Sequence, residues 1–158
     1  MPQVSEGWVR GRRLGVDPGA VRVGLAVSDP DGVLATPLDT LARDRKRGTD
    51  LDQLAAYAEE YEVIEIVVGR PVGLSGRDGR AAQAADEYAA LIEARLPDVP
   101  VSRQDERFST VTAAGRLRGA GLDARAQRGV IDRAAATEIL QTWLDAHRAR
   151  QRPHSEDC

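Results

Sequence analysis

The spacing of apolar residues changes along this chain between a period of two and a period of about 3.6, and the change separates predicted strands from predicted helices. Three short apolar runs joined by turn signals predict antiparallel strands over 13–17, 22–29 and 32–38. The elements predicted after them are a helix over 48–62, a strand over 63–69, a helix over 80–95, a strand over 99–106, and helices over 109–119 and 129–150. This order predicts an α/β fold whose mixed sheet has three antiparallel strands followed by parallel strands, with helices on both faces.

The last predicted helix has two neighbouring apolar rows with a spacing of four residues. One row is Ile131, Ala135, Ile139 and Trp143, and the other is Asp132, Ala136, Leu140 and Leu144. Together the rows form the stripe that we expect to pack on the sheet. An acid therefore lies on an inward-facing row, where a carboxylate is unusual.

Composition describes a globular chain with few aromatic residues. The sequence has 158 residues, of which 42% are apolar, 30% charged and 4% aromatic. We expect one folded domain over 12–146, with a flexible leader over 1–11 and a flexible tail over 147–158. No apolar run is long enough for a membrane span, and the single cysteine, Cys158, provides no internal disulfide framework. These features predict a cytoplasmic protein without membrane contact.

The net charge of −3 excludes a uniformly basic nucleic-acid binder, but the basic residues are unevenly distributed. Arginines outnumber acids between residues 103 and 133, and basic clusters also occur at 10–13, at 43–47 and in the tail. Each cluster alone is typical of a solvated face. Together they could form a surface that follows a phosphate backbone.

Carboxylates occur where strands end. Asp17 closes the first predicted strand between Gly15 and Gly19, and Asp105 and Glu106 close the last one. Because ligands bind beyond the carboxyl ends of strands in such sheets, we expect these acids to converge with Asp132 at one edge. Carboxylates brought together must take up protons or bind a cation, and their oxygens suit Mg²⁺ or Mn²⁺. The glycines would allow a backbone or a phosphate to approach closely.

Four segments carry a family resemblance: "LGVDPGAVRVGLAVSD", "IVVGRPVGLSGRDG", "DERFSTVTA" and "IDRAAATEILQTWL". In their order and spacing the chain resembles the YqgF/RuvX-type family over about residues 12–145. Members are described as pre-16S rRNA processing nucleases or as Holliday junction resolvases, with a ribonuclease H-like fold. The resemblance implies a metal-dependent nuclease that hydrolyses phosphodiester bonds of structured nucleic acid, with Mg²⁺ or Mn²⁺ as cofactor.

The resemblance also implies residue roles. The family's three catalytic, metal-binding acids fall on Asp17, Glu106 and Asp132. Asp105 also matches, and the sequence does not decide whether it binds metal or orients the loop. Two basic positions, Arg22 and Arg107, are expected either to contact substrate phosphate or to pair with the acids. Asp29 matches a recurrent family position, and we interpret it as a turn residue. Arg70 departs from the leucine that is usual at its position.

Several functions remain open at this point. The preferred one is 5′-end processing of pre-16S rRNA in ribosome biogenesis. The first alternative is a resolvase for branched DNA in recombination and repair, for which a symmetric homodimer would be expected. The second is a non-catalytic nucleic-acid or ribosome-assembly binding module. A sugar-kinase-like ATPase shares the Gly-x-Asp-x-Gly hairpin, but it would leave Glu106 and Asp132 without a role.

Overall fold

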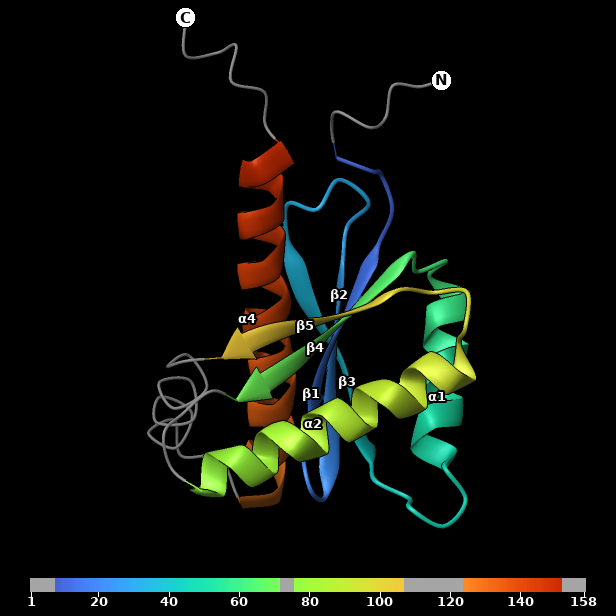
Figure 1. The fold of residues 1–158 in the computed structure, drawn as a ribbon, viewed down its shortest axis with the longest axis vertical. Coiled ribbons are helices and arrows are strands. Elements are labelled where there is room, and N and C mark those ends of the chain that lie inside the picture. Colours follow the sequence, from blue (N-terminus) through green and yellow to red (C-terminus); the bar gives the residue numbers. More distant parts are fainter. Residues whose placement is uncertain (1–7, 72–75, 107–123, 152–158) are drawn as a thin grey trace, which may run out of the picture.

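The protein folds around one five-stranded sheet with helices on both faces (Figure 1), and the computed structural model describes residues 8–71, 76–106 and 124–151. In chain order the elements are β1 (Arg13–Pro18), β2 (Arg22–Ser28), β3 (Ala35–Ala42), α1 (Thr49–Glu60), β4 (Glu65–Pro71), α2 (Gly76–Arg95), β5 (Val101–Glu106) and α4 (Ala124–Gln151). The predicted helix over 109–119 lies outside the described residues.

The sheet has the strand order β3-β2-β1-β4-β5. Strands β1, β2 and β3 pair antiparallel, whereas β4 pairs parallel with both β1 and β5. This arrangement confirms the predicted mixed sheet. It also makes β1 the central strand, so that its carboxyl end is flanked by β2 on one side and β4 on the other.

Different helices cover the two faces of the sheet, and each face has its own hydrophobic core. Helices α1 and α2 cover one face, where Leu54 and Tyr88 pack with Leu14 and Val16 of β1. Helix α4 covers the opposite face. Its buried side chains all belong to the predicted apolar stripe, namely Ala135, Ala136, Ile139, Leu140, Trp143 and Leu144, whereas Ile131 and Asp132 of that stripe are half-buried. The residues of β1 that alternate with Leu14 and Val16, including Asp17, therefore face α4.

The third strand was predicted too early in the chain. It was expected over 32–38 but runs over Ala35–Ala42. Val33 and Leu34 remain exposed because their backbone N–H groups donate to Asp29 Oδ1, at 2.8 and 2.9 Å, and this holds them in the turn. These hydrogen bonds lower the pKa of the Asp29 carboxyl group, as expected for the turn residue that we predicted.

Helix α2 also begins earlier than predicted, at Gly76 instead of residue 80, and α4 extends over Ala124–Gln151 instead of 129–150. Trp8, which we placed in the leader, packs edge-on against Trp143 of α4 with ring centroids 6.3 Å apart. Among the described residues, no helix has the length and apolarity to cross a membrane.

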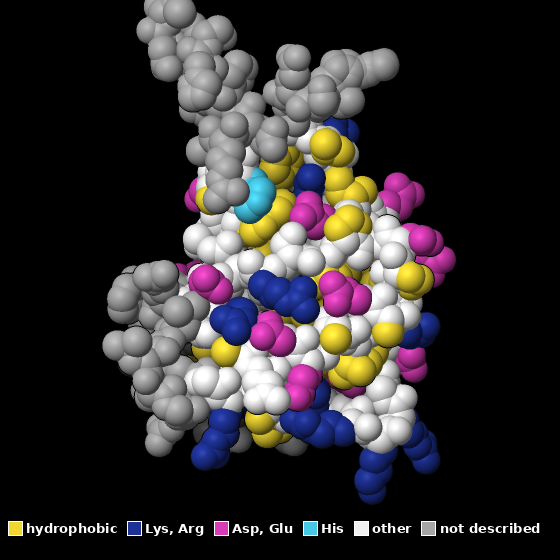
Figure 2. All heavy atoms as spheres, in the orientation of Figure 1, with side chains coloured by type: hydrophobic (Ala, Val, Ile, Leu, Met, Phe, Trp, Pro, Cys, Tyr) yellow, Lys and Arg dark blue, Asp and Glu magenta, His cyan; other side chains and the backbone are white. Residues whose placement is uncertain are grey.

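The charged surface is uneven. Acidic and basic side chains intermingle over much of the visible face, whereas Lys and Arg side chains project from its lower end (Figure 2). In Figure 1 this lower end contains the β3–α1 connection and the turn between β1 and β2.

Candidate active site

The register of the sheet places Asp17 and Glu106 on the same face. Asp17 pairs with Gly24 of β2. On its other side Val16 pairs with Val68 of β4, so the next residues of the two parallel strands, Asp17 and Gly69, lie level with each other. Gly69 pairs with Gln104 of β5, and Glu106 is two residues further along that strand. Since alternate residues of a strand share a face, Glu106 points to the side of the sheet that Asp17 faces. The two acids therefore end strands β1 and β5 on the α4 side.

Helix α4 brings Asp132 to this face by lying directly on the strands. A Cβ atom added to Gly24 would collide with the backbone oxygen of Asp132, and one added to Gly69 would collide with Ile139. The same position on Gly69 lies 2.9 Å from Glu106 Oε2. Glycine is therefore required in both strands so that the helix and the carboxylates can come close.

Gly15 has a related role. A Cβ atom there would lie 2.7 Å from Leu140 Cβ and 3.0 Å from the backbone oxygen of Ala136. The sequence predicted the approach of a backbone or a phosphate at Gly15, and the approaching group is the α4 backbone. Gly19 instead closes the β1–β2 turn, where its N–H donates to the Arg22 carbonyl oxygen at 2.9 Å.

The charges of the three acids are coupled. Loss of hydration, followed by the negative charges of Glu106 and Asp132, raises the pKa of Asp17 from 3.8 to about 8. Carboxylates that share a site disfavour one another's ionised form, so Asp17 holds a proton at neutral pH unless a cation compensates. The convergence of these acids is the electrostatic feature that a metal-binding site requires.

Arg22 supplies a positive charge to this cluster. Its guanidinium Nε donates to Asp132 Oδ2 at 2.8 Å, and both side chains are partly buried. Arg22 was expected either to contact substrate phosphate or to pair with the acids, and in the structure it forms an ion pair with one of the acids. Arg107, the other predicted basic residue, lies outside the described part of the chain.

Asp105 does not join the cluster. It pairs with Arg70 in the β4–β5 register, and its side chain points to the face opposite Glu106. On that face the Arg70 guanidinium Nε donates to Asp86 of α2 at 3.1 Å, and Asp86, followed by the more distant charge of Asp105, raises the pKa of Arg70. Arg70, the departure noted in the sequence, therefore ties β4 to α2 on the side away from the three acids.

The chemistry of the donor set fits a divalent cation. Three carboxylates offer hard oxygen atoms, and their mutual repulsion would be relieved by bound positive charge. Within the described residues, however, no group of three His, Cys, Asp or Glu side chains is already arranged to hold a metal ion. Asp17, Glu106 and Asp132 thus form a candidate site whose side chains would have to adjust around the ion.

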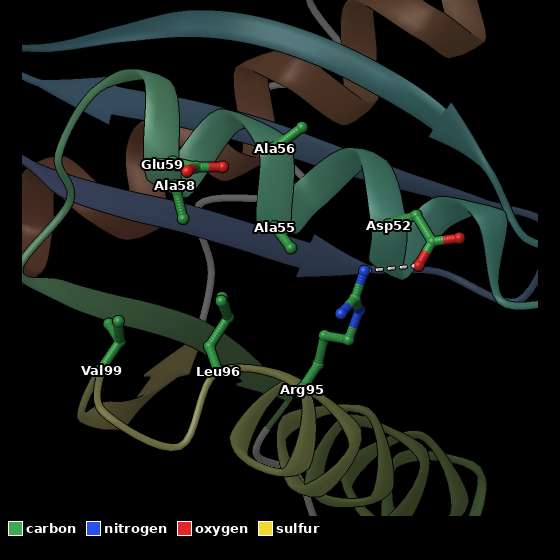
Figure 3. Close-up of a pocket in the computed structure, with 8 residues that line it drawn as sticks. All are labelled: Asp52, Ala55, Ala56, Ala58, Glu59, Arg95, Leu96 and Val99. Carbon is green, nitrogen blue, oxygen red and sulfur yellow. Dashed lines mark hydrogen bonds and ion pairs between the residues drawn. The ribbon is translucent and has the colours of Figure 1, made fainter.

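A cavity of about 450 Å³ lies elsewhere, between α1 and the end of α2 (Figure 3). Alanine side chains line much of it, and Arg95 Nη2 donates to Asp52 Oδ1 at 2.8 Å at one end. None of the three coupled acids lines this cavity. It has no convergent set of acids or nucleophiles, so it is a poor candidate for catalysis.

Comparison with known proteins identifies relatives over most of the chain. A protein of Rhodococcus jostii (strain RHA1), provisionally named pre-16S rRNA nuclease, is 50% identical over 139 residues, which are 86% of this chain and 78% of that protein. One of Mycobacterium tuberculosis (strain ATCC 25177 / H37Ra) with the same provisional name is 54% identical over 136 residues, covering 86% and 79% of the two chains. Both relatives thus match most of this chain.

A solved structure shares the architecture. RuvC of T. thermophilus in complex with a Holliday junction substrate superposes with a TM-score of 0.57 at 16% identity, covering 89% of this chain and 97% of that chain. This similarity confirms the predicted ribonuclease H-like fold. The model of the RuvX family, described as Holliday junction resolvase, matches residues 11–146. The chain that carries Asp17, Glu106 and Asp132 on one face of this sheet belongs to the RuvX family.

Proposed function

We propose that the protein is a metal-dependent nuclease that hydrolyses phosphodiester bonds of structured nucleic acid, with Asp17, Glu106 and Asp132 as its catalytic acids. The observation that carries the proposal is the placement of Asp17, Glu106 and Asp132 on one face of the sheet, under α4, where desolvation and the two neighbouring charges raise the pKa of Asp17. Like charges held close together are costly, and such clusters often serve to bind a cation or to transfer a proton. Membership of a family of nucleases supports the same reading.

The three acids would hold Mg²⁺ or Mn²⁺ at the carboxyl end of β1. A divalent ion bound there supplies an activated water and positive charge near the scissile phosphate. Asp17 would release its proton as the cation binds, because ion ligands must be ionised. Arg22 holds Asp132 Oδ2 at 2.8 Å and thereby orients that carboxylate toward the sheet.

The substrate that we propose is the 5′-extended precursor of 16S rRNA. The provisional names of relatives from several bacteria that are about half identical in sequence support this choice. Branched DNA is the second candidate, because the family description names Holliday junctions and RuvC has the same fold. The two candidates share their chemistry and differ in the shape of the nucleic acid.

The test compares the wild type with Asp17→Asn and with Asp105→Asn. Labelled 16S precursor RNA and a labelled four-way DNA junction are incubated with each protein in Mg²⁺, in Mn²⁺ and in chelator. Asp105→Asn is the matched control, because it removes one carboxylate charge from the same edge of the sheet but from its opposite face. We expect metal-dependent cleavage by the wild type and the control, and a loss of at least about 100-fold in Asp17→Asn.

Each outcome decides a different part of the proposal. Preferential cleavage of the RNA supports rRNA processing, and preferential cleavage of the junction supports the resolvase. Equal loss in both variants would mean that the two faces are not functionally distinct. If all three proteins bind the nucleic acids equally and none cleaves them in either metal, the protein is a binding module instead of a nuclease.

A further inference from the structure

The β3–α1 connection, residues 43–48, is fastened to the turn that follows Asp17. The backbone N–H of Arg43 donates to the Val21 carbonyl oxygen at 2.9 Å. The guanidinium group of Arg43 donates to the Gly19 carbonyl oxygen, also at 2.9 Å. Arg45 Nη2 donates to the Ala20 carbonyl oxygen at 3.1 Å. Three hydrogen bonds thus join this connection to residues 19–21, and its position is fixed relative to the end of β1.

Arg43 anchors the connection from the inside. Its guanidinium lies 3.5 Å from the buried Asp50 carboxylate and 4.6 Å above the ring centroid of Tyr88. Asp50 also accepts a hydrogen bond of 2.9 Å from the Tyr88 hydroxyl group. This first arginine of the cluster is therefore occupied by the core and is not available to a partner.

The backbone of the connection is held by Asp44. Its carboxylate accepts hydrogen bonds from the N–H groups of Lys46 and Arg47, at 3.2 and 3.0 Å, and from Thr49 Oγ1 at 2.8 Å. These bonds lower the pKa of Asp44, so the carboxylate is charged at neutral pH. Gly48, with φ of 68°, reverses the chain in a conformation that favours glycine. The connection is thus built as a defined loop.

Three consecutive cations, Arg45, Lys46 and Arg47, are exposed on this loop. In the part of the chain that the structure describes, neither Lys46 nor Arg47 forms an ion pair with a carboxylate. Basic side chains project into solvent at the lower end of the molecule, where this loop lies (Figures 1 and 2). Lys46 and Arg47 are therefore exposed and without a carboxylate partner among the described residues, and the hydrogen bonds of Arg45 and Asp44 hold the loop that presents them.

We propose that Arg45, Lys46 and Arg47 are a docking surface for the phosphate backbone of nucleic acid, which we call the basic loop. The inference rests on the proposed nuclease function and extends it to substrate positioning. Phosphate contacts fix the register of a nucleic acid without reading its sequence. Because the loop is fastened to the turn after Asp17, a backbone docked on it is held at a set distance from the carboxylates. The basic loop therefore helps to select which phosphodiester bond reaches the acids.

The test measures binding without cleavage. Dissociation constants of labelled 16S precursor RNA and of a four-way DNA junction are measured from 50 to 300 mM salt, in chelator, with all proteins carrying Asp17→Asn. The triple variant Arg45→Ala/Lys46→Ala/Arg47→Ala is compared with the matched triple variant Arg10→Ala/Arg12→Ala/Arg95→Ala. The control removes the same charge from positions whose cations contact Asp31, the Ser28 carbonyl oxygen and Asp52.

We expect the slope of log binding constant against log salt to fall in magnitude by about 2–3 in the basic-loop variant, since each lost phosphate contact removes about 0.7–0.9. The control should change the slope by less than about 1. Arg45→Lys/Arg47→Lys, which keeps the charges, should retain most of the slope. Equal slopes in the basic-loop variant and its parent, or an equal fall in the control, overturn the proposal.

The outcome is independent of catalysis. If the wild type cleaves neither nucleic acid but the basic-loop variant alone loses salt-dependent binding, the nuclease proposal fails and the docking surface stands. If the wild type cleaves and the basic-loop variant binds like its parent, the nuclease stands and the docking surface fails. Thermal melting of each variant, with midpoints within about 3 °C of the parent, verifies that the fold is retained.

Discussion

Replacing Asp17 with asparagine removes a charge that the folded protein disfavours while keeping the shape of the side chain. The Asp17 carboxyl group ionises near 3.8 in the unfolded chain, but enclosure and the charges of Glu106 and Asp132 raise its pKa to about 8 in the folded protein. Between these two values the folded protein binds one more proton than the unfolded chain. The free energy of unfolding therefore decreases as the pH rises through this window. Because asparagine does not titrate, the free energy of unfolding of Asp17→Asn does not decrease in this way.

The pKa difference sets the size of the effect. At pH 7 the Asp17 carboxyl group is ionised in the unfolded chain and still mostly protonated in the folded protein. Each pKa unit corresponds to about 1.4 kcal/mol, so this group lowers the free energy of unfolding of the wild type by at most about 4 kcal/mol between pH 3 and pH 7. Because relaxation of the folded protein reduces this change in the free energy of unfolding, we expect about 2–4 kcal/mol. For a domain of this size it corresponds to a rise of about 4–16 °C in the melting temperature of the variant at pH 7.

The assay is urea unfolding of the wild type and Asp17→Asn from pH 4 to pH 9 in chelator, followed by circular dichroism. The difference in free energy of unfolding should be small at pH 4, grow steadily towards pH 8 and level off above it. Added Mg²⁺ should then stabilise the wild type and leave the variant nearly unchanged. A difference that stays constant across this range, or a variant less stable than the wild type at pH 8, would refute the argument that the three acids repel one another.

Three further substitutions test the packing on the two faces of the sheet. Gly24→Ala should destabilise the protein by about 3 kcal/mol in urea unfolding, because the new methyl group meets the Asp132 backbone and must push α4 away. Tyr88→Phe should cost about 1–3 kcal/mol in the same assay, because Asp50 loses a buried hydrogen bond of 2.9 Å. Leu140→Ala, at a fully buried position of α4, should cost about 2–5 kcal/mol with an unchanged m-value; a cost below 1 kcal/mol would mean that α4 packs loosely on the sheet.

The order and type of the described elements followed from the sequence because their signals were local. Turn residues at 18–19 separate β1 from β2, and the apolar rows of the last helix identify the side chains that α4 buries. The bounds of β3 were wrong because apolar character there does not mark the strand. Val33 and Leu34 are held in a turn by Asp29, whereas the polar Asp39 belongs to the strand and accepts a 2.6 Å hydrogen bond from the Tyr57 hydroxyl group.

The resemblance placed the family's acid on Glu106, but whether Asp105 joins it beside Asp17 required the structure. Neighbouring residues of a strand point to opposite faces, so the choice depends on how β5 aligns with β4. Pairing between strands is a tertiary property that one sequence does not contain. The glycines offered a usable signal that we did not exploit for Gly24 and Gly69: glycine inside a strand often marks the close approach of another backbone.

Because α4 completes the candidate active site by packing on the sheet, the site can form only late in translation of the chain. Asp17 lies in the first strand and Asp132 in the last helix, so most of the chain must leave the ribosome before the two acids can meet. A nascent chain that has already formed its antiparallel strands still lacks the carboxylate that α4 delivers over Gly24. Local unfolding of α4 would dismantle the same cluster in a finished molecule. The proposed active site therefore exists only in chains whose α4 has folded onto the sheet.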